Sequence, residues 1–393
     1  MNEPSAPQSS PSPASSDTRL LQRPPANVAP PQAAATLSAR LSTALIDALI
    51  DACERGLLPD ALVRAGMRSL MRQRLLDEGL LRPPLAAERL AALVEELRQS
   101  PIAKDTDAAN EQHYEVPAAF FHLHLGPRLK YSCAWYETGT ESLAQAEEAM
   151  FRLYAERAGL ANGQRILDLG CGWGSMSLWM AERFPGAQIV GLSNSHGQRE
   201  FIEARARERG LRNVTILTAN VVQAEFPLQG IQAQFDRVVS IEMFEHMKNY
   251  QSLFAKVASW MNPGAQALVH VFAHRTLAYH YEVQNASDWM TKYFFTGGIM
   301  PSADLFLHFQ DHLKVQRRWW VDGRHYEKTS NHWLQGMDAA RERILPVFEQ
   351  AYGDQEAARW FQRWRMFYMA VAELFGYDQG RQWGVAHYLF EKR

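Results

Sequence analysis

The chain has 393 residues, 47% of them hydrophobic, with 41 Lys and Arg against 43 Asp and Glu. This length allows two or three domains with a sizeable core. A formal net charge of -2 provides no general attraction for phosphates, which argues against a nucleic-acid partner. Three cysteines without a C-x-x-C pair exclude a disulfide framework and a zinc ribbon, so we expect reduced thiols in the cytoplasm.

Residues 1–36 form a tail rich in Pro, Ser and Ala, with eight prolines among the first 35 residues. Such a composition cannot bury enough apolar surface to offset chain entropy, so we expect a disordered tail. No apolar stretch approaches the roughly 20 residues of a membrane-spanning helix. The protein is therefore expected to be soluble or, at most, bound to a membrane surface.

Residues 37–112 are predicted to be a helical N-terminal region, because apolar residues recur there at spacings of three and four. The second of its helices carries Arg64, Arg68, Arg72 and Arg74. These arginines could contact acidic lipid headgroups, or they could form an ordinary solvated face beside the following domain. The second interpretation is favoured.

Residues 113–393 alternate short apolar runs with helical patterns, which is typical of a doubly wound α/β fold with a largely parallel sheet. An aromatic-rich, helical stretch at about 275–380 is expected to be an insertion that caps the active site. The predicted strands are Arg165–Leu169, Gln188–Leu192, Val214–Thr218, Phe235–Ile241, Ala267–Phe272 and Trp383–Glu391.

The most informative motif is the sequence Ile-Leu-Asp-Leu-Gly-Cys-Gly-Trp-Gly at 166–174, which ends the first predicted strand. Glycines at such a bend let the backbone approach a ligand, and the following helix offers a partly positive N-terminus. A nucleotide-like ligand is expected there. The spacing differs from G-x-G-x-x-G, and it resembles the motif of S-adenosylmethionine-dependent methyltransferases. The candidate cofactor residues in it are Asp168, Gly170, Gly172 and Gly174.

Further segments resemble the superfamily of cyclopropane fatty acid synthases and mycolic acid cyclopropane synthases. They are Gly191-Leu-Ser193 followed by Gln198, His113-Tyr114-Glu-Val-Pro, the run from Leu129 to Tyr136, and Asp236–Met247. Chain-wide, the sequence resembles most the coclaurine N-methyltransferase branch of that group. The resemblance implies a class I methyltransferase fold and S-adenosylmethionine as cofactor. It also implies that Tyr131 and Ser132 contact the methionine portion, and that Ser193, Gln198 and Asn220 serve the ribose and adenine.

The methyl acceptor is open to three hypotheses. The main prediction is methyl transfer to the double bond of an unsaturated fatty acyl chain, with bicarbonate as base, because Cys133, Glu245, His270 and Tyr326 match the bicarbonate positions of cyclopropane synthases. The alternative is a small amine, with Glu242 and His246 as the catalytic pair of a coclaurine-type N-methyltransferase. The third is a non-catalytic lipid- or cofactor-binding protein. The histidine spacing predicts no metal site, and the sequence leaves the oligomeric state open.

Overall fold

The computed structural model describes residues 37–103, 117–283 and 288–393, with side chains from Leu45 onward. The tail 1–36 and the segment containing His113 and Tyr114 lie outside the described residues. Internal contacts divide the chain into residues 1–42 and residues 43–393. The second unit contains the sheet and all side chains discussed below.

The predicted helical N-terminal region consists of α1 (Leu37–Glu54), α2 (Asp60–Asp77) and α3 (Pro83–Gln99). Arg64 and Arg68 of α2 form ion pairs with Glu373 at 3.0 Å and 2.6 Å, and Arg74 pairs with Asp288 at 3.0 Å. These arginines therefore bind acidic groups of the same chain, which supports the interpretation as an ordinary helix face. Among the described residues, no helix is long and apolar enough to cross a membrane.

A seven-stranded sheet forms the centre of the second unit, in the order β3-β2-β1-β4-β5-β9-β8. The five strands from β3 to β5 are parallel, and β9 pairs antiparallel with both β5 and β8. The doubly wound sheet predicted from the sequence is thus confirmed. The strands are β1 (Arg165–Leu169), β2 (Gln188–Ser193), β3 (Val214–Thr218), β4 (Phe235–Ile241), β5 (Met261–His274), β8 (Leu313–Val321) and β9 (Trp383–Lys392).

Strand β8 lies inside the range 275–380 that was expected to be cap. Its sequence Leu-Lys-Val-Gln-Arg-Arg-Trp-Trp-Val lacks a regular apolar alternation, because β8 is an edge strand and its central residues are exposed. The rest of that range is mainly helical: α10 (Trp289–Phe294), α11 (Gly323–Ala339), α12 (Arg341–Tyr352) and α13 (Asp354–Gly376), with the short strands β6 (Tyr279–His280) and β7 (Ile299–Met300).

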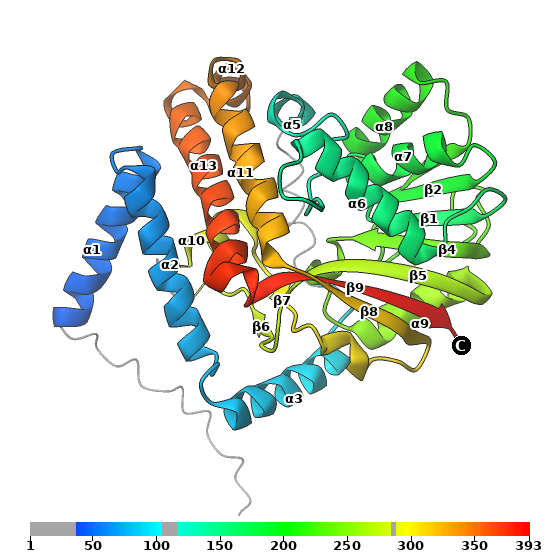
Figure 1. Ribbon diagram of the computed structural model, residues 1–393, viewed down its shortest axis with the longest axis horizontal. Coiled ribbons are helices and arrows are strands. Elements are labelled where there is room, and N and C mark those ends of the chain that lie inside the picture. Colours follow the sequence, from blue (N-terminus) through cyan, green and yellow to red (C-terminus); the bar gives the residue numbers. More distant parts are fainter. Residues whose placement is uncertain (1–36, 104–116, 284–287) are drawn as a thin grey trace, which may run out of the picture. The chain divides into compact units, whose positions relative to one another are not determined.

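Helices cover both faces of the sheet (Figure 1). On one face lie α6 (Leu143–Ala158), α7 (Ser175–Arg183) and α8 (His196–Glu208), and on the other lie α9 (Tyr250–Trp260) and α3. Each face has its own apolar core: Ile166 of β1 belongs to the core that contains Phe151 of α6, whereas Leu167 and Leu169 belong to the core that contains Phe254 of α9. Successive side chains of β1 point to opposite faces of the sheet, and each face has an apolar core, which explains why β1 carries apolar residues on both of its faces.

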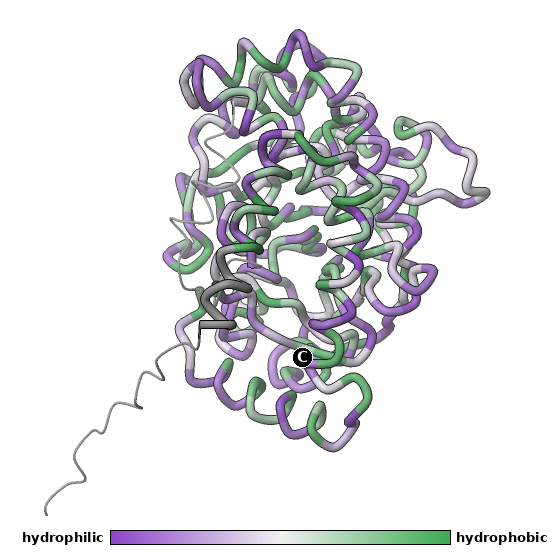
Figure 2. Tube along the Cα trace, turned by 90° about the vertical axis from the view of Figure 1, so that its left-hand side faces the viewer, coloured by the Kyte–Doolittle hydropathy of each residue, from purple (hydrophilic) through white to green (hydrophobic). Residues whose placement is uncertain are grey.

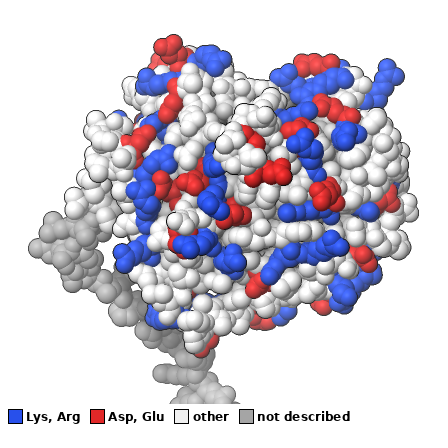
Figure 3. Space-filling view, viewed as in Figure 1, with Lys and Arg blue, Asp and Glu red and all other residues white. Residues whose placement is uncertain are grey.

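Polar residues lie mainly outside these cores. Figure 2 shows apolar and polar residues alternating along the helices, as expected for helices that bury one face. On the face drawn in Figure 3, basic and acidic side chains are interspersed. That distribution agrees with the near-zero net charge, and the described residues on this face form no broad basic surface for nucleic acid or acidic lipid.

Candidate active site

The glycine-rich bend between β1 and α7 opens into a cavity. Gly172 has φ +52°, and a Cβ added there would meet nothing within 4 Å, so its Cα faces open space. Gly174 has φ +75°, but a Cβ there would lie 2.6 Å from Ile202 of α8. Gly174 is therefore required for close packing against α8. It does not line the cavities described below, in contrast to its expected role in cofactor binding.

Two cavities meet at this bend and share Gly170, Gly172 and Met243 in their walls. The side cavity, which extends toward the ends of β2 and β3, is lined by Ser193, Gln198 and Asn220 among others. The central cavity lies on the other side of the bend. It is lined by Tyr131, Ser132 and Asp168 together with residues of the cap and of the segment after β4. Ligands of doubly wound folds bind at such a position, where the strand order reverses.

The side cavity contains a hydrogen-bond donor without a partner. Gln198 is buried, its Oε1 accepts a hydrogen bond of 2.6 Å from Ser193 Oγ, and its Nε2 has none within the described residues. A buried unpaired donor is costly, and a ribose hydroxyl would satisfy it. Asn220 also lines this cavity, and its Oδ1 accepts a hydrogen bond from the Val222 backbone N–H at 2.9 Å, which holds its amide at the cavity wall.

Asp168, at the end of β1, is 2% exposed and accepts a 2.6 Å hydrogen bond from Ser177. Burial raises the pKa of its carboxyl to about 6, despite the hydrogen bonds from Ser177, which act in the opposite direction. A carboxyl group in this environment gains from a nearby cation. The ammonium group of a methionine moiety is such a cation, so the residues of both cavities fit S-adenosylmethionine.

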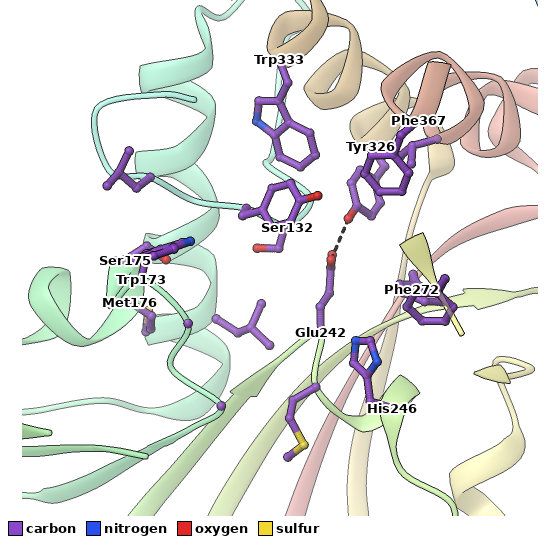
Figure 4. Close-up of a pocket in the computed structure, with 18 of the residues that line it drawn as sticks. Ser132, Trp173, Ser175, Met176, Glu242, His246, Phe272, Tyr326, Trp333 and Phe367 are labelled. Atoms are coloured by element: carbon purple, nitrogen blue, oxygen red, sulfur yellow. Dashed lines mark hydrogen bonds between the residues drawn. The ribbon is translucent and has the colours of Figure 1, made fainter. Parts of the chain in front are cut away.

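The walls of the central cavity are rich in aromatic side chains, several of which are labelled in Figure 4. Of the described residues in them, Asp168, Glu242 and His246 are titratable carboxylates or imidazoles, and none is Lys or Arg. The aromatic side chains are Tyr131, Trp173, Phe272, Tyr281, Phe295, Tyr326, Trp333, Phe367 and Phe375.

Glu242 directly follows β4 and carries the carboxylate at the centre of this cavity. Its Oε1 accepts hydrogen bonds from the Cys133 backbone N–H at 3.1 Å and from His270 Nε2 at 3.0 Å. Its Oε2 accepts a 2.7 Å hydrogen bond from the Tyr326 hydroxyl, drawn in Figure 4. Three donors from distant parts of the chain thus hold one carboxylate in place.

The backbone of Glu242 has φ +50°, a conformation that a non-glycine residue adopts at a cost of about 1 kcal/mol or more. Its N–H is hydrogen-bonded to the carbonyl of His270 at 2.9 Å, which holds the residue against β5. The hydrogen bonds from the Cys133 backbone N–H, His270 and Tyr326 to its carboxylate compensate for this strain. Strained residues of this kind cluster at functional sites.

Lys130 is a buried cation close to Glu242, and it is not among the residues that the sequence motifs predict for the site. Its Nζ donates to Ser132 Oγ and, at 2.7 Å, to the carbonyl of Cys133, and it lies 5.3 Å from the ring centre of Tyr154. Burial lowers the pKa of Lys130 to about 8, whereas burial raises the pKa of Glu242, against the charge of Lys130 and the hydrogen bond from Tyr326. The only signal in the sequence was a lysine between Leu129 and Tyr131, next to apolar residues.

Three of the four residues expected to hold bicarbonate donate hydrogen bonds to Glu242 instead. Cys133 contributes only its backbone N–H, since its thiol donates to the Ala134 carbonyl at 3.3 Å. Glu245 is fully buried outside the cavity wall, and its Oε1 accepts from the Phe272 backbone at 2.7 Å. Because the Glu242 carboxylate already accepts from Cys133, His270 and Tyr326, these residues do not fit a bicarbonate ion.

His246 lies on a short 3-10 helix (Phe244–His246) and, like Glu242, lines the central cavity. Its ring centre is 4.9 Å from that of Phe295, at an angle of 49°. The structure therefore brings Glu242 and His246 into one cavity, as expected for the amine hypothesis. Among the described residues there is no group of three or more His, Cys, Asp or Glu side chains that could bind a metal ion.

The model of the mycolic acid cyclopropane synthetase family matches residues 103–379. The chain belongs to this family. The (S)-coclaurine N-methyltransferase of Thalictrum flavum subsp. glaucum is 37% identical over 344 residues, which cover 86% of this chain and 94% of that enzyme. The crystal structure of a coclaurine N-methyltransferase bound to N-methylheliamine and SAH has a TM-score of 0.85 and 35% identity, and the match covers 88% of this chain and all of that one.

This member of the cyclopropane synthetase family is an S-adenosylmethionine-dependent methyltransferase with the class I fold, as the sequence predicted. The alternative of a non-catalytic binding protein is set aside.

The prediction of an unsaturated fatty acyl chain as acceptor is wrong. The cyclopropane-fatty-acyl-phospholipid synthase of Escherichia coli strain K12 is 30% identical over 62% of this chain, less in both identity and coverage than the Thalictrum (S)-coclaurine N-methyltransferase. The match at the bicarbonate positions does not indicate the acceptor, because in the fold the Glu242 carboxylate accepts the hydrogen bonds that Cys133, His270 and Tyr326 would donate to an anion.

Proposed function

We propose that this methyltransferase transfers the methyl group of S-adenosylmethionine to the nitrogen of a small, apolar amine. The observation that carries the proposal is the placement of Glu242, whose carboxylate is held by Cys133, His270 and Tyr326 in the wall of the aromatic cavity. The relatives that match most of the chain, the coclaurine-type N-methyltransferases, support the same assignment.

In the proposed reaction the amine nitrogen attacks the methyl carbon of the sulfonium. The N–C bond forms, and the S–C bond breaks with its electron pair remaining on sulfur, which yields S-adenosylhomocysteine. A protonated amine has no lone pair, so its proton must first pass to a base. Burial raises the pKa of Glu242, which makes this carboxylate a stronger base than an exposed one and suits it to the step. His246, in the same wall, is proposed to orient the nitrogen.

The cavity walls indicate the substrate class. Aromatic rings attract both the sulfonium and an ammonium through their faces, by about 0.5–2 kcal/mol per well-placed ring. Because no described wall residue is Lys or Arg, a carboxylate or phosphate on the substrate would be buried without a counter-charge. We therefore expect an amine on an apolar, ring-containing skeleton that lacks acidic groups.

The test uses the full chain with methyl-labelled S-adenosylmethionine and three acceptors: 1,2,3,4-tetrahydroisoquinoline, its 3-carboxylic acid, and vesicles of dioleoyl phosphatidylglycerol. Label should appear in tetrahydroisoquinoline, while the matched acid should be methylated at least about tenfold more slowly, which corresponds to about 1.4 kcal/mol. Label in the lipid with none in either amine would overturn the proposal.

A further inference from the structure

A row of hydrogen-bonded side chains leads away from Glu242. It passes from β5 to the neighbouring strand β9 and ends at α6. His270 on β5 and His387 on β9 are directly opposite each other in the antiparallel pairing of these strands. His387 Nε2 lies 2.9 Å from His270 Nδ1, and both rings are fully buried. Arg157 of α6, which is half-buried, donates to His387 Nδ1. The row thus runs from Arg157 through His387 and His270 to Glu242 Oε1.

The chemistry of the two ends determines the direction of every hydrogen bond in this row. A guanidinium can only donate, so His387 Nδ1 must accept and His387 Nε2 must carry the proton. His387 Nε2–H then donates to His270 Nδ1, which leaves the proton of His270 on Nε2. That proton points at Glu242 Oε1, which as a carboxylate oxygen can only accept.

The groups around the row are compatible with this direction. Tyr154 OH also lies 2.8 Å from His270 Nδ1; a hydroxyl can point its proton at this nitrogen and share its single lone pair with His387 Nε2–H, so this contact does not require a proton on Nδ1. Burial lowers the pKa of His270 and of His387 well below the ordinary histidine value, and the charges of Lys130 and Arg157 act in the same direction. Both imidazoles are therefore neutral, and a neutral imidazole has one donor and one acceptor nitrogen.

We propose that Arg157 and His387 are positioning residues that lock His270 in its Nε2–H tautomer, so that His270 always donates to Glu242. The inference rests on the proposed function of Glu242 as the base at the acceptor nitrogen. Since the guanidinium does not release its proton, the row orients the carboxylate and does not conduct protons to the surface. A His270 in the other tautomer would present a bare nitrogen to the carboxylate, and the repulsion would displace it from the cavity.

The test of the lock needs no methyl acceptor. In the full chain labelled with ¹⁵N-histidine and saturated with S-adenosylhomocysteine, the signals of His270 are assigned by their loss in His270→Gln. We expect the Nε2–H tautomer of His270 in the wild type and a substantial Nδ1–H population in His387→Leu. In His387→Gln the Nε2–H tautomer should return, because the amide oxygen can accept from Arg157 while the amide NH₂ donates to His270.

Arg157 provides a second variant that leaves the core filled. Arg157→Met removes the obligate donor and should release the tautomer of His270, whereas Arg157→Lys keeps a donor and should retain the lock. Turnover of 1,2,3,4-tetrahydroisoquinoline should fall about tenfold in kcat in His387→Leu and Arg157→Met and recover in the conservative variants. The dissociation constant of S-adenosylhomocysteine should stay within a factor of two, which also reports folding.

An Nδ1–H tautomer in the wild type, or an unchanged Nε2–H tautomer in both His387→Leu and Arg157→Met, would overturn the proposed lock. Failure of the proposed function has a different signature. In that case the tautomers would respond as expected, while the wild type itself would transfer no methyl group to the amine.

Discussion

The hydroxyl of Tyr326 donates a 2.7 Å hydrogen bond to Glu242 Oε2, although 84 positions separate the two residues in the sequence. Tyr326 lies in the first turns of α11, in the cap, whereas Glu242 follows β4 in the sheet. This contact couples the cap to the carboxylate at the centre of the cavity. The cap therefore contributes directly to the polar part of the proposed site.

Tyr326→Phe removes this donor and leaves Glu242 Oε2 buried with one partner fewer. We expect kcat for tetrahydroisoquinoline to fall about tenfold, or about 1.4 kcal/mol in the barrier, because the carboxylate is held less firmly. The control is Tyr388→Phe, which removes the hydrogen bond from another buried tyrosine to the Ala303 carbonyl, away from the cavity. Equal losses of kcat in both variants would contradict the role of Tyr326.

Glu242→Gly should convert the carboxylate position into an empty anion site. Glycine tolerates the φ of +50° at this position, while Cys133 N–H, His270 and Tyr326 remain as donors. Turnover should fall by about 100-fold or more and be partly restored by added formate with saturation kinetics. Glu242→Gln fills the same space with an amide, so formate should not rescue it. Rescue of both variants to the same degree would show that formate acts elsewhere.

Gly172 and Gly174 should respond differently to an added methyl group. In Gly172→Ala the methyl enters the open space of the cofactor cavities, so the affinity for S-adenosylhomocysteine should fall at least about tenfold, with about 1–2 kcal/mol lost in stability from the positive φ. In Gly174→Ala the methyl would meet Ile202, so overpacking should cost a further 1–3 kcal/mol, roughly, and lower Tm more. Calorimetric titration and thermal unfolding of both variants measure the difference. Equal Tm values would contradict the packing role of Gly174.

Cofactor affinity should depend on pH through Asp168. Because burial raises the pKa of its carboxyl to about 6, the group is largely ionised above this pH and neutral below it in the unliganded protein. The ammonium group of S-adenosylhomocysteine prefers the ionised form, so affinity should weaken as the pH falls through about 6, by up to about tenfold per pH unit. Titrations between pH 5 and 8 measure this slope. Asp168→Asn should bind more weakly at pH 8 and show a flatter profile; an unchanged slope would assign the titration to another group.

Much of the fold was predictable because it depends on local patterns. The runs that form β1, β3 and β4 were predicted with their observed bounds, since each has a short, buried apolar stretch of the length of a strand. Strand β8 was assigned to the cap instead, because an edge strand with arginines at its centre carries no such pattern. The bend at Gly170 and Gly172 was also predictable, because positive φ and close approach to a ligand both require glycine.

The role of the polar residues could not be predicted in the same way. Cys133, His270 and Tyr326 meet in the fold as donors to Glu242, whereas the sequence suggested that they bind an external anion. Lys130 and His387 were not predicted as site residues, because a single lysine or histidine has no characteristic spacing that would indicate a functional role. Gly174 was grouped with the cofactor residues, although its neighbour is Ile202 of α8.

The sequence by itself therefore determined the class I methyltransferase fold and the position of the cofactor bend, because strand burial and glycine conformation depend on residues close together in the chain. Only the tertiary structure decided that the Glu242 carboxylate accepts the hydrogen bonds of Cys133, His270 and Tyr326. Hydrogen bonds between residues more than 80 positions apart depend on how the strands and the cap pack, and no spacing within the sequence records that geometry.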